Sequence, residues 1–507
     1  MVLLVECGIY FGDKMGDLKR GRVGRMKRRD FLKLAGAGAA AMLLPERLWA
    51  ARAGGHKPNI VFIFADDQAF NTVRAMGCDE VETPNLDRLV KSGVTFTHAY
   101  NMGSWSGAVC IASRTMLNTG LFLWHAEKVY RETDEQFRQR GRMWSQLLRK
   151  GGYDTYMTGK WHLKADAIKS FTLARHIRPG MPKQTEQGYN RPIEGKPDLW
   201  KPWDRKFGGY WEGGRHWSEV LGDDATEFIA QASKSENPFF MYLAFNAPHD
   251  PRQSPREYVE KYPLDKVKVP ESFMPEYPYK DRIGCGKKQR DERLAPFPRS
   301  RYAVKVNRQE YYAIITHMDR QIGRILDALA ESGKGDNTYV FFTADHGLAV
   351  GHHGLMGKQN MFDHSVRVPL MVTGPQIPAG SKIRAPVYLQ DIMPSTLEVA
   401  GVDKPSHVQF NSLMPLIEGK AYNSYEAVYG AYLELQRMVT EGDYKLILYP
   451  QIAKVLLFDL RKDPEELNDV ASVPGYKHVV DRLFETLLRL QKQTGDTLDL
   501  KSFYPRL

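Results

Sequence analysis

The chain has 507 residues and a formal net charge of +11, with 42% hydrophobic and 26% charged residues. Its composition and the lack of an internal period exclude a repeat array and a disordered chain. A chain of this length exceeds the size at which one hydrophobic core keeps growing, so we expect one large domain with a smaller companion.

The N-terminal segment has the pattern of a twin-arginine signal. Residues 1–53 hold eleven Lys and Arg against five Asp and Glu. The run MKRRDFLK at 26–33 leads into an apolar stretch at 34–44 that is too short to span a bilayer, and small residues at 50, 51 and 53 offer cleavage sites. We therefore predict that residues 1–53 are an N-terminal extension and signal peptide, with Met26 as the true initiator. The twin-arginine export machinery is then a partner, and the mature protein, with no transmembrane segment, is periplasmic or secreted.

The central part of the chain alternates between predicted strands and helices. An apolar run at 59–65, rich in β-branched and aromatic residues, predicts a buried strand of a parallel sheet. Thr83 and Pro84 then begin a helix that ends at Ser92. Further strands are predicted at 153–158, 239–245, 339–343 and 370–373, and an amphipathic helix at 308–332. This order indicates an α/β fold, a doubly wound, mostly parallel sheet flanked by helices, for a catalytic domain at residues 54–422.

The pattern changes after residue 422. Short strands at 427–432 and 444–449 are followed by a helix at 476–493. We expect a smaller C-terminal α+β domain at residues 423–507, with an antiparallel sheet plus a helix.

Two long stretches, residues 164–217 and 251–307, lack a regular pattern, and such loops in a compact domain are usually functional. The first carries aromatic and basic residues in alternation: Trp200, Lys201, Trp203, Arg205, Lys206, Tyr210, Trp211, Arg215 and Trp217. These predict either a wall that stacks on sugars and binds anions or a local hydrophobic cluster. The basic stretch 287–308 faces either a polyanionic substrate or solvent. No nucleic-acid motif accompanies it, so we expect no nucleic acid as a partner.

Residues capable of chemistry follow the ends of several predicted strands: Asp66 and Asp67, Lys160 and His162, His249, Asp345 and His346. Each alone fits a turn or a strand-end cap, but a doubly wound sheet brings these ends to one edge. Three carboxylates at one point repel strongly unless a cation compensates them, and oxygen ligands suit Ca²⁺ first and Mg²⁺ second. We expect a metal site formed by Asp66, Asp67 and Asp345, with His346 as a further ligand.

The chain beyond residue 53 has three cysteines, Cys78, Cys110 and Cys285. An odd number argues against a disulfide framework. The twin-arginine route carries folded proteins, so it allows one of these cysteines to be modified in the cytoplasm before export.

Cys110 begins a recognisable motif. The run CIASR at 110–114 matches the signature Cys, any residue, Pro or Ala, Ser, Arg. Other familiar segments occur in order: DD at 66–67, TPNLD at 83–87, TGKWH at 158–162, APH at 247–249, TADHG at 343–347, GK at 357–358, RVPL at 367–370 and FDL at 458–460. Over about residues 57–470 the chain resembles the type I, formylglycine-dependent sulfatases of the alkaline phosphatase superfamily.

The resemblance implies hydrolysis of a sulfate ester, with a sulfated carbohydrate as the favoured substrate. A formylglycine-generating maturation enzyme, either radical-type or oxygen-dependent, would convert Cys110 to an aldehyde, whose hydrate binds the cation and attacks sulfur. Cys110 thus joins the implied metal ligands.

The resemblance also implies roles for the other motif residues: Arg114 neutralises the sulfate charge, Lys160 and Lys358 stabilise the sulfuryl oxygens, His249 or Lys358 protonates the leaving alcohol, and His162 accepts a proton. Two further functions stay open. One is a phosphonate or phosphate ester hydrolase of the same superfamily. The other is a catalytically inactive protein that binds sulfated glycans, which the intact set of motif residues disfavours.

Overall fold

The structure is a computed structural model that describes residues 56–507. The predicted extension and signal peptide at residues 1–53 lie outside the described residues. The described part is built on an eight-stranded sheet with the order β13-β2-β12-β10-β1-β9-β5-β6. These strands are Ser381–Ile383, Val94–Phe96, Leu370–Thr373, Thr338–Ala344, Asn59–Asp66, Phe239–Pro248, Asp154–Lys160 and Leu173–Arg178 in that order.

Five neighbouring strands of this sheet, β10, β1, β9, β5 and β6, all run parallel. β12 pairs antiparallel with β10, and β2 pairs antiparallel with β12. The strands β1, β9 and β10 are fully buried, which explains their continuous apolar sequences. The carboxyl ends of the five parallel strands meet at one edge of the sheet.

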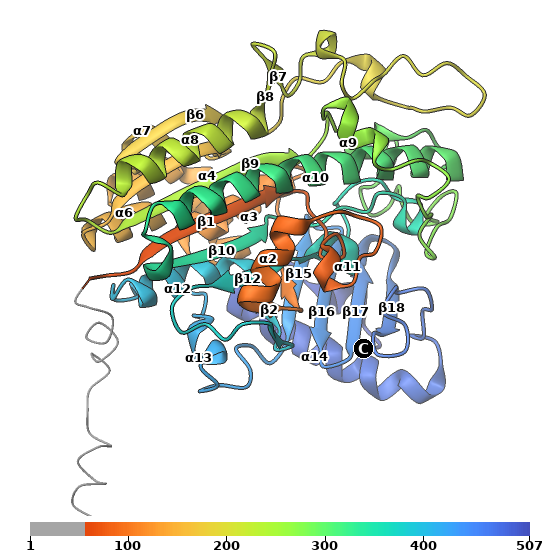
Figure 1. Ribbon diagram of the computed structural model, residues 1–507. Coiled ribbons are helices and arrows are strands. Elements are labelled where there is room, and N and C mark those ends of the chain that lie inside the picture. Colours follow the sequence, from red (N-terminus) through yellow and green to blue (C-terminus); the bar gives the residue numbers. More distant parts are fainter. Residues whose placement is uncertain (1–55) are drawn as a thin grey trace, which may run out of the picture. The chain divides into compact units, whose positions relative to one another are not determined.

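Helices cover both faces of the sheet (Figure 1). The helices α2 (Pro84–Ser92), α8 (Trp217–Ala232) and α10 (Arg301–Glu331) pack on one face. The other face carries α3 (Val109–Thr119), α6 (Trp144–Lys150) and α12 (Ile392–Val399). Trp144 of α6 is fully buried and its ring lies 5.0 Å from that of Phe62 in β1 and 4.9 Å from that of Phe240 in β9. This double layer holds the strand ends in fixed positions.

A second sheet has the order β18-β17-β16-β15-β4. Its strands β15 (Val428–Tyr432), β16 (Gln436–Glu441), β17 (Tyr444–Tyr449) and β18 (Lys454–Asp459) are antiparallel, and α14 (Lys477–Thr494) packs against them. The fifth strand, β4 (Gly103–Ser104), pairs parallel with β15. The sheet thus takes in a strand from the loop before Cys110, and the division between residues 422 and 423 stays a prediction.

The remaining elements are short. The helices are α4 (Leu123–Glu132), α5 (Asp134–Gln139), α7 (Ala167–Ser170), α9 (Arg256–Glu260), α11 (Asp363–Val366), α13 (Met414–Ile417) and α15 (Leu500–Phe503). Two small sheets join β11 (Arg367–Val368), β3 (Ala99–Tyr100) and β14 (Val387–Tyr388), and β7 (Trp211–Glu212) with β8 (Arg215–His216).

The predicted fold class is confirmed, and all five strands predicted in the first domain are present. The strands β2, β6, β13, β16 and β18 were not predicted from the sequence, and the long amphipathic helix was predicted to begin at residue 308. The helix begins at Arg301, because the hydroxyl of Ser300 caps it by accepting a hydrogen bond from the amide of Ala303.

The aromatic residues at 200–217 largely form a local cluster. Trp200 and Tyr210 are buried, and the ring of Trp200 stacks on Phe207 with 4.9 Å between centroids. Trp203 and Trp211 stay partly exposed, with Arg256 and Arg205 over their rings. Packing rather than sugar stacking explains the buried members of this segment.

Candidate active site

The residues predicted from the strand ends do come together. Asp66 and Lys160 are the last residues of β1 and β5. His249 follows β9, and Asp345 and His346 follow β10. All five side chains are buried. The parallel sheet therefore concentrates them at one edge, as a doubly wound fold does for ligand-binding groups.

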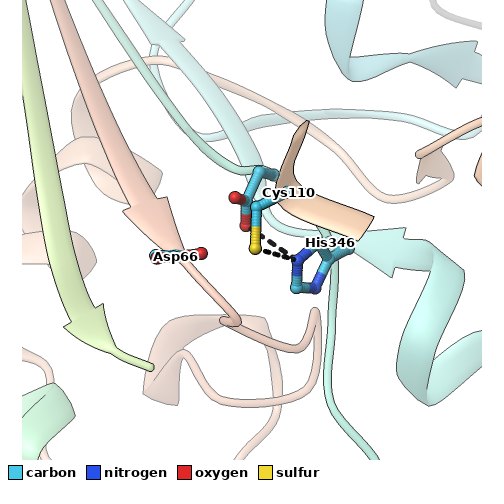
Figure 2. A group of neighbouring side chains, drawn as sticks. Asp66, Cys110 and His346 are labelled. Atoms are coloured by element: carbon cyan, nitrogen blue, oxygen red, sulfur yellow. Dashed lines mark hydrogen bonds and ion pairs between the residues drawn. The ribbon is translucent and has the colours of Figure 1, made fainter. Parts of the chain in front are cut away.

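Cys110 approaches this edge from α3. The helix begins at Val109, so the thiol lies in its first turn, at the positive end of the helix dipole. The Sγ atom lies 3.4 Å from Nε2 of His346 and 3.7 Å from Nζ of Lys358. Figure 2 shows Cys110, Asp66 and His346 pointing toward one another from α3, the end of β1 and the segment after β10. Cys110 is 2% exposed.

Two overlapping sets of side chains could hold a metal ion. One set is Asp66, Cys110, Asp345 and His346, and the other is Asp66, Asp67, Cys110 and His249. Within each set the ligand atoms lie within 4.8 Å of one another, and every residue is buried. Oδ1 of Asp66 has no hydrogen-bond partner within residues 56–507. A buried carboxylate oxygen without a donor is a fitting cation ligand.

Buried cations surround the carboxylates. Lys160 forms an ion pair with Asp66, and both side chains are fully buried. Nε of Arg114 donates to Oδ2 of Asp345 at 3.2 Å, and Nη1 donates to the carbonyl of Lys160 at 2.8 Å. Arg114 lies one turn after Cys110 on α3, so the same helix delivers both groups. Arg114 therefore faces the carboxylates of Asp345 and Asp66 from α3.

Asp67 is held in a strained conformation. Its φ of 69° lies in the left-handed region, which is uncommon for residues other than glycine. Its amide donates to Oδ1 of Asp345 at 3.1 Å, and its carbonyl accepts from the hydroxyl of Tyr311 at 2.5 Å. Strain of this kind is typical of functional sites and needs such surrounding support. It turns the carboxylate toward Lys358, whose Nζ donates to both carboxylate oxygens at 2.8 Å.

Three histidines complete the site. Nδ1 of His346 lies 2.9 Å from the carbonyl of Gly347, so this nitrogen carries the proton, and Nε2 faces the site. Nδ1 of His162 is buried and has no hydrogen-bond partner within residues 56–507, and burial lowers the pKa of His162. Nε2 of His249 lies 3.8 Å from Oδ2 of Asp67, and Nδ1 lies 2.7 Å from the carbonyl of Asp250.

The close packing of charged groups shifts the pKa values of several side chains in the site. Burial and the charge of Asp345 raise the pKa of Asp66 well above its ordinary value. Burial also acts to raise the pKa of Cys110, but Lys160 and Lys358 outweigh it and hold that pKa well below its ordinary value. Burial acts to lower the pKa of His346, and the charges of Asp345 and Asp67 reverse this and raise it to about 9. The position of residue 110 thus favours negative charge.

Several residues at this site were not found from the sequence. Asp250 contacts His249, and Asp291 lies 3.7 Å from Nζ of Lys358. Arg290 contacts both of these carboxylates. Arg290 and Asp291 come from the irregular basic stretch, where neither periodicity nor a strand end singles them out. Within residues 56–507 no helix is both long and apolar enough to cross a membrane.

Comparison with known proteins agrees with this geometry. Residues 58–402 match the family model described as Sulfatase, and residues 351–493 match the model described as N-sulphoglucosamine sulphohydrolase, C-terminal. Residues 25–45 match the model for a twin-arginine translocation pathway signal sequence, which indicates export across the cytoplasmic membrane.

Individual relatives cover most of the chain. An arylsulfatase of Clostridium perfringens is 29% identical over 85% of this chain and 94% of its own length. An N-acetylglucosamine-6-O-sulfatase of Bacteroides thetaiotaomicron is 26% identical, with 87% of each chain covered. A protein solved in complex with D-glucosamine-2-N,6-O-disulfate shares the fold, with a TM-score of 0.69, 24% identity and coverage of 87% of this chain and 99% of that one. The chain belongs to the sulfatase family, a family of sulfuric ester hydrolases within the alkaline phosphatase superfamily.

Proposed function

We propose that the protein hydrolyses the sulfate ester of a sulfated carbohydrate, with Cys110 converted to formylglycine and one divalent cation bound beside it. The observation that carries this proposal is the position of Sγ of Cys110. It lies within reach of His346 and Lys358 and belongs to both candidate metal sets. This sulfur marks the place that the formylglycine oxygens would take.

The donor set fits a hard cation. Asp66, Asp67 and Asp345 offer carboxylate oxygens, and one of these, Oδ1 of Asp66, has no donor within the described chain. Carboxylates are the preferred ligands of Ca²⁺ and Mg²⁺, and we assign Ca²⁺ first because it accepts more ligands in a flexible arrangement. His346 would add a nitrogen ligand through Nε2.

Together, formylglycine and the cation would supply an oxygen nucleophile of lowered pKa. The side chains of this protein then act on the ester. Lys160 and Lys358 place positive charge where the sulfuryl oxygens gain negative charge. Arg114 compensates the negative charge of Asp345 and Asp66, so that the net charge of the site suits an anionic substrate.

We assign proton transfer to His162 and to the two residues that contact Asp67, which are His249 and Lys358. His249 or Lys358 would donate a proton to the leaving alcohol, which is a poor leaving group when it is aliphatic. His162 would accept a proton from residue 110, whose pKa His162 helps to lower. Its neutral form suits a base, because burial lowers the pKa of His162.

The substrate class rests on the relatives. The names arylsulfatase and N-acetylglucosamine-6-O-sulfatase describe those two proteins, and we extend sulfate ester hydrolysis on an amino sugar or related saccharide to this chain. Aryl sulfates should also react, since a phenol leaves with less help from an acid.

Maturation and location follow from burial and from the signal sequence. Cys110 is 2% exposed, so a maturation enzyme would have to reach it before folding is complete. The twin-arginine signal would then carry the folded, converted protein to the periplasm or beyond.

The test is the mass of the Cys110 peptide from protein made in its native host. Conversion of the thiol to the aldehyde lowers the mass by about 18 Da, because sulfur and two hydrogens leave as oxygen enters. A screen of sulfated saccharides beside matched phosphate and phosphonate esters follows. An unmodified thiol in active protein would refute the mechanism. Faster turnover of the phosphorus esters would favour the alternative hydrolase, and glycan binding without turnover would favour the inactive protein.

A further inference from the structure

Arg290 joins two buried carboxylates that lie beside the two candidate proton donors. Its Nη1 atom contacts Asp250, and its Nη2 atom contacts Asp291. The arginine side chain is 32% exposed, whereas the two carboxylates are 3% and 2% exposed. Arg290 therefore reaches in from the surface and ends between them.

Each of the two carboxylates also contacts one of the candidate proton donors. Oδ1 of Asp250 lies 3.2 Å from Nδ1 of His249. Oδ2 of Asp291 lies 3.7 Å from Nζ of Lys358. Both donors then meet at Asp67, whose carboxylate lies 2.8 Å from Lys358 and 3.8 Å from His249. The six side chains form a closed ring in which basic and acidic groups alternate: His249, Asp250, Arg290, Asp291, Lys358 and Asp67.

The ring explains why an arginine stands at this position. Two carboxylates this deeply buried cost free energy unless cations compensate them. A guanidinium presents several N–H groups in a planar fork, so it can pair with both carboxylates at once. A lysine has a single charged nitrogen and would have to favour one of them. Asp291 also accepts from Nε2 of Gln359 at 2.6 Å, which fixes its orientation further.

We propose that Arg290 is a positioning residue, which acts through Asp250 and Asp291 to hold His249 and Lys358 ready to protonate the leaving alcohol. The inference deepens the proposed function and rests on it. Lys358 has a long flexible stem, and misplacement of a catalytic group by 1 Å can cost on the order of 100-fold in rate. With Arg290 absent, the two carboxylates lose their shared partner and the donors lose their outer support.

The leaving group of the substrate provides the test. Acid assistance matters greatly for an aliphatic alcohol and little for an acidic phenol. The variant Arg290→Gln is compared with wild type on 4-nitrophenyl sulfate, phenyl sulfate and N-acetylglucosamine 6-sulfate. We expect kcat to fall by less than about tenfold for the nitrophenyl ester, because Asp67 still holds the charge of Lys358 in the site, and by about 100-fold or more for the sugar, with KM nearly unchanged.

Two further variants serve as controls. Arg290→Lys should give intermediate values, because one carboxylate keeps a partner. Arg293→Gln removes a neighbouring arginine that lies over Tyr189 and 3.6 Å from Glu186, and it should leave all three substrates unaffected. Thermal unfolding of each variant shows whether the fold is intact.

Three outcomes would overturn the inference: an equal loss for all leaving groups, a rise of KM for the sugar with kcat unchanged, or the same losses in Arg293→Gln. The second would make Arg290 a direct contact of the sugar. A crystal structure of Arg290→Gln gives a readout that needs no activity, and we expect Lys358 or His249 to leave its wild-type position. Unchanged positions would refute the inference. Absence of wild-type turnover on every sulfate ester would instead refute the proposed function.

Discussion

Replacement of His346 by Asn should remove much of the pH dependence of cation binding. Burial acts to lower the pKa of His346, but Asp345 and Asp67 outweigh it and raise the pKa to about 9. Below that pH the ring carries a proton that opposes a cation at Nε2. Affinity for Ca²⁺ should therefore rise with pH through the neutral range and level off near pH 9.

The magnitude follows from the distance between the working pH and this pKa. At pH 7 the ring must give up a proton about two pH units below its pKa, which costs roughly 2.7 kcal/mol, or about 100-fold in affinity. Each pH unit gained should improve binding by about tenfold until the pKa is reached. Asn does not titrate, so His346→Asn should lack this contribution.

Calorimetric titration of Ca²⁺ into chelator-treated protein at pH 6, 7 and 8 measures the effect. Both proteins carry Cys110→Ser, so that residue 110 does not titrate. Asp345 and Asp67 remain to raise the pKa of His346, and the loss of the Cys110 charge makes the effect somewhat smaller than in the wild-type site. The carboxylates are common to both proteins, so the difference between the two slopes isolates His346. Equal slopes, or an affinity in the His346 protein that is flat with pH, would show that the ring is already neutral without the cation.

Three other changes probe the same framework. Arg114→Met removes the buried guanidinium that pairs with Asp345, while Lys160 still pairs with Asp66, so in chelator it should lower the free energy of unfolding by about 3–5 kcal/mol, measured in urea. Lys358→Ala should lower kcat by about 100- to 1,000-fold for 4-nitrophenyl sulfate while the fold stays intact by circular dichroism. Trp144→Ala leaves a cavity against the sheet and should cost about 3–5 kcal/mol in the same urea assay, and a cost below about 1 kcal/mol would contradict the packing.

Strand ends were the part of the site that the sequence could reveal. The runs at 59–65, 239–245 and 339–343 are apolar throughout because β1, β9 and β10 are buried on both faces. Their polar successors, such as Asp66 and His249, therefore stand out at the boundary. Parallel pairing of these strands then brings the successors together without any further information.

Other elements depend on tertiary contacts that leave no local pattern. The strand β6 reads LARHIR and is only partly buried at the sheet edge, so it lacks the apolar run of a central strand. The strand β16 reads QRMVTE, and its buried Arg437 is neutralised by Asp496, far along the chain. The predicted role of Arg290 and Asp291 likewise depends on distant residues: His249 lies 41 residues before Arg290, and Lys358 lies 67 residues after Asp291.

The two buried cysteines, Cys110 and Cys285, lie in opposite electrostatic environments. Burial raises the pKa of the Cys285 thiol, and the charges of Glu292 and Asp291 raise it further. At Cys110 burial acts in the same direction, but Lys160 and Lys358 reverse it. The first environment keeps a thiol neutral and inert, whereas the second attracts negative charge. An aldehyde-derived nucleophile and a sulfate group both bring negative charge, so the surroundings of residue 110 suit the chemistry that its sequence motif predicts.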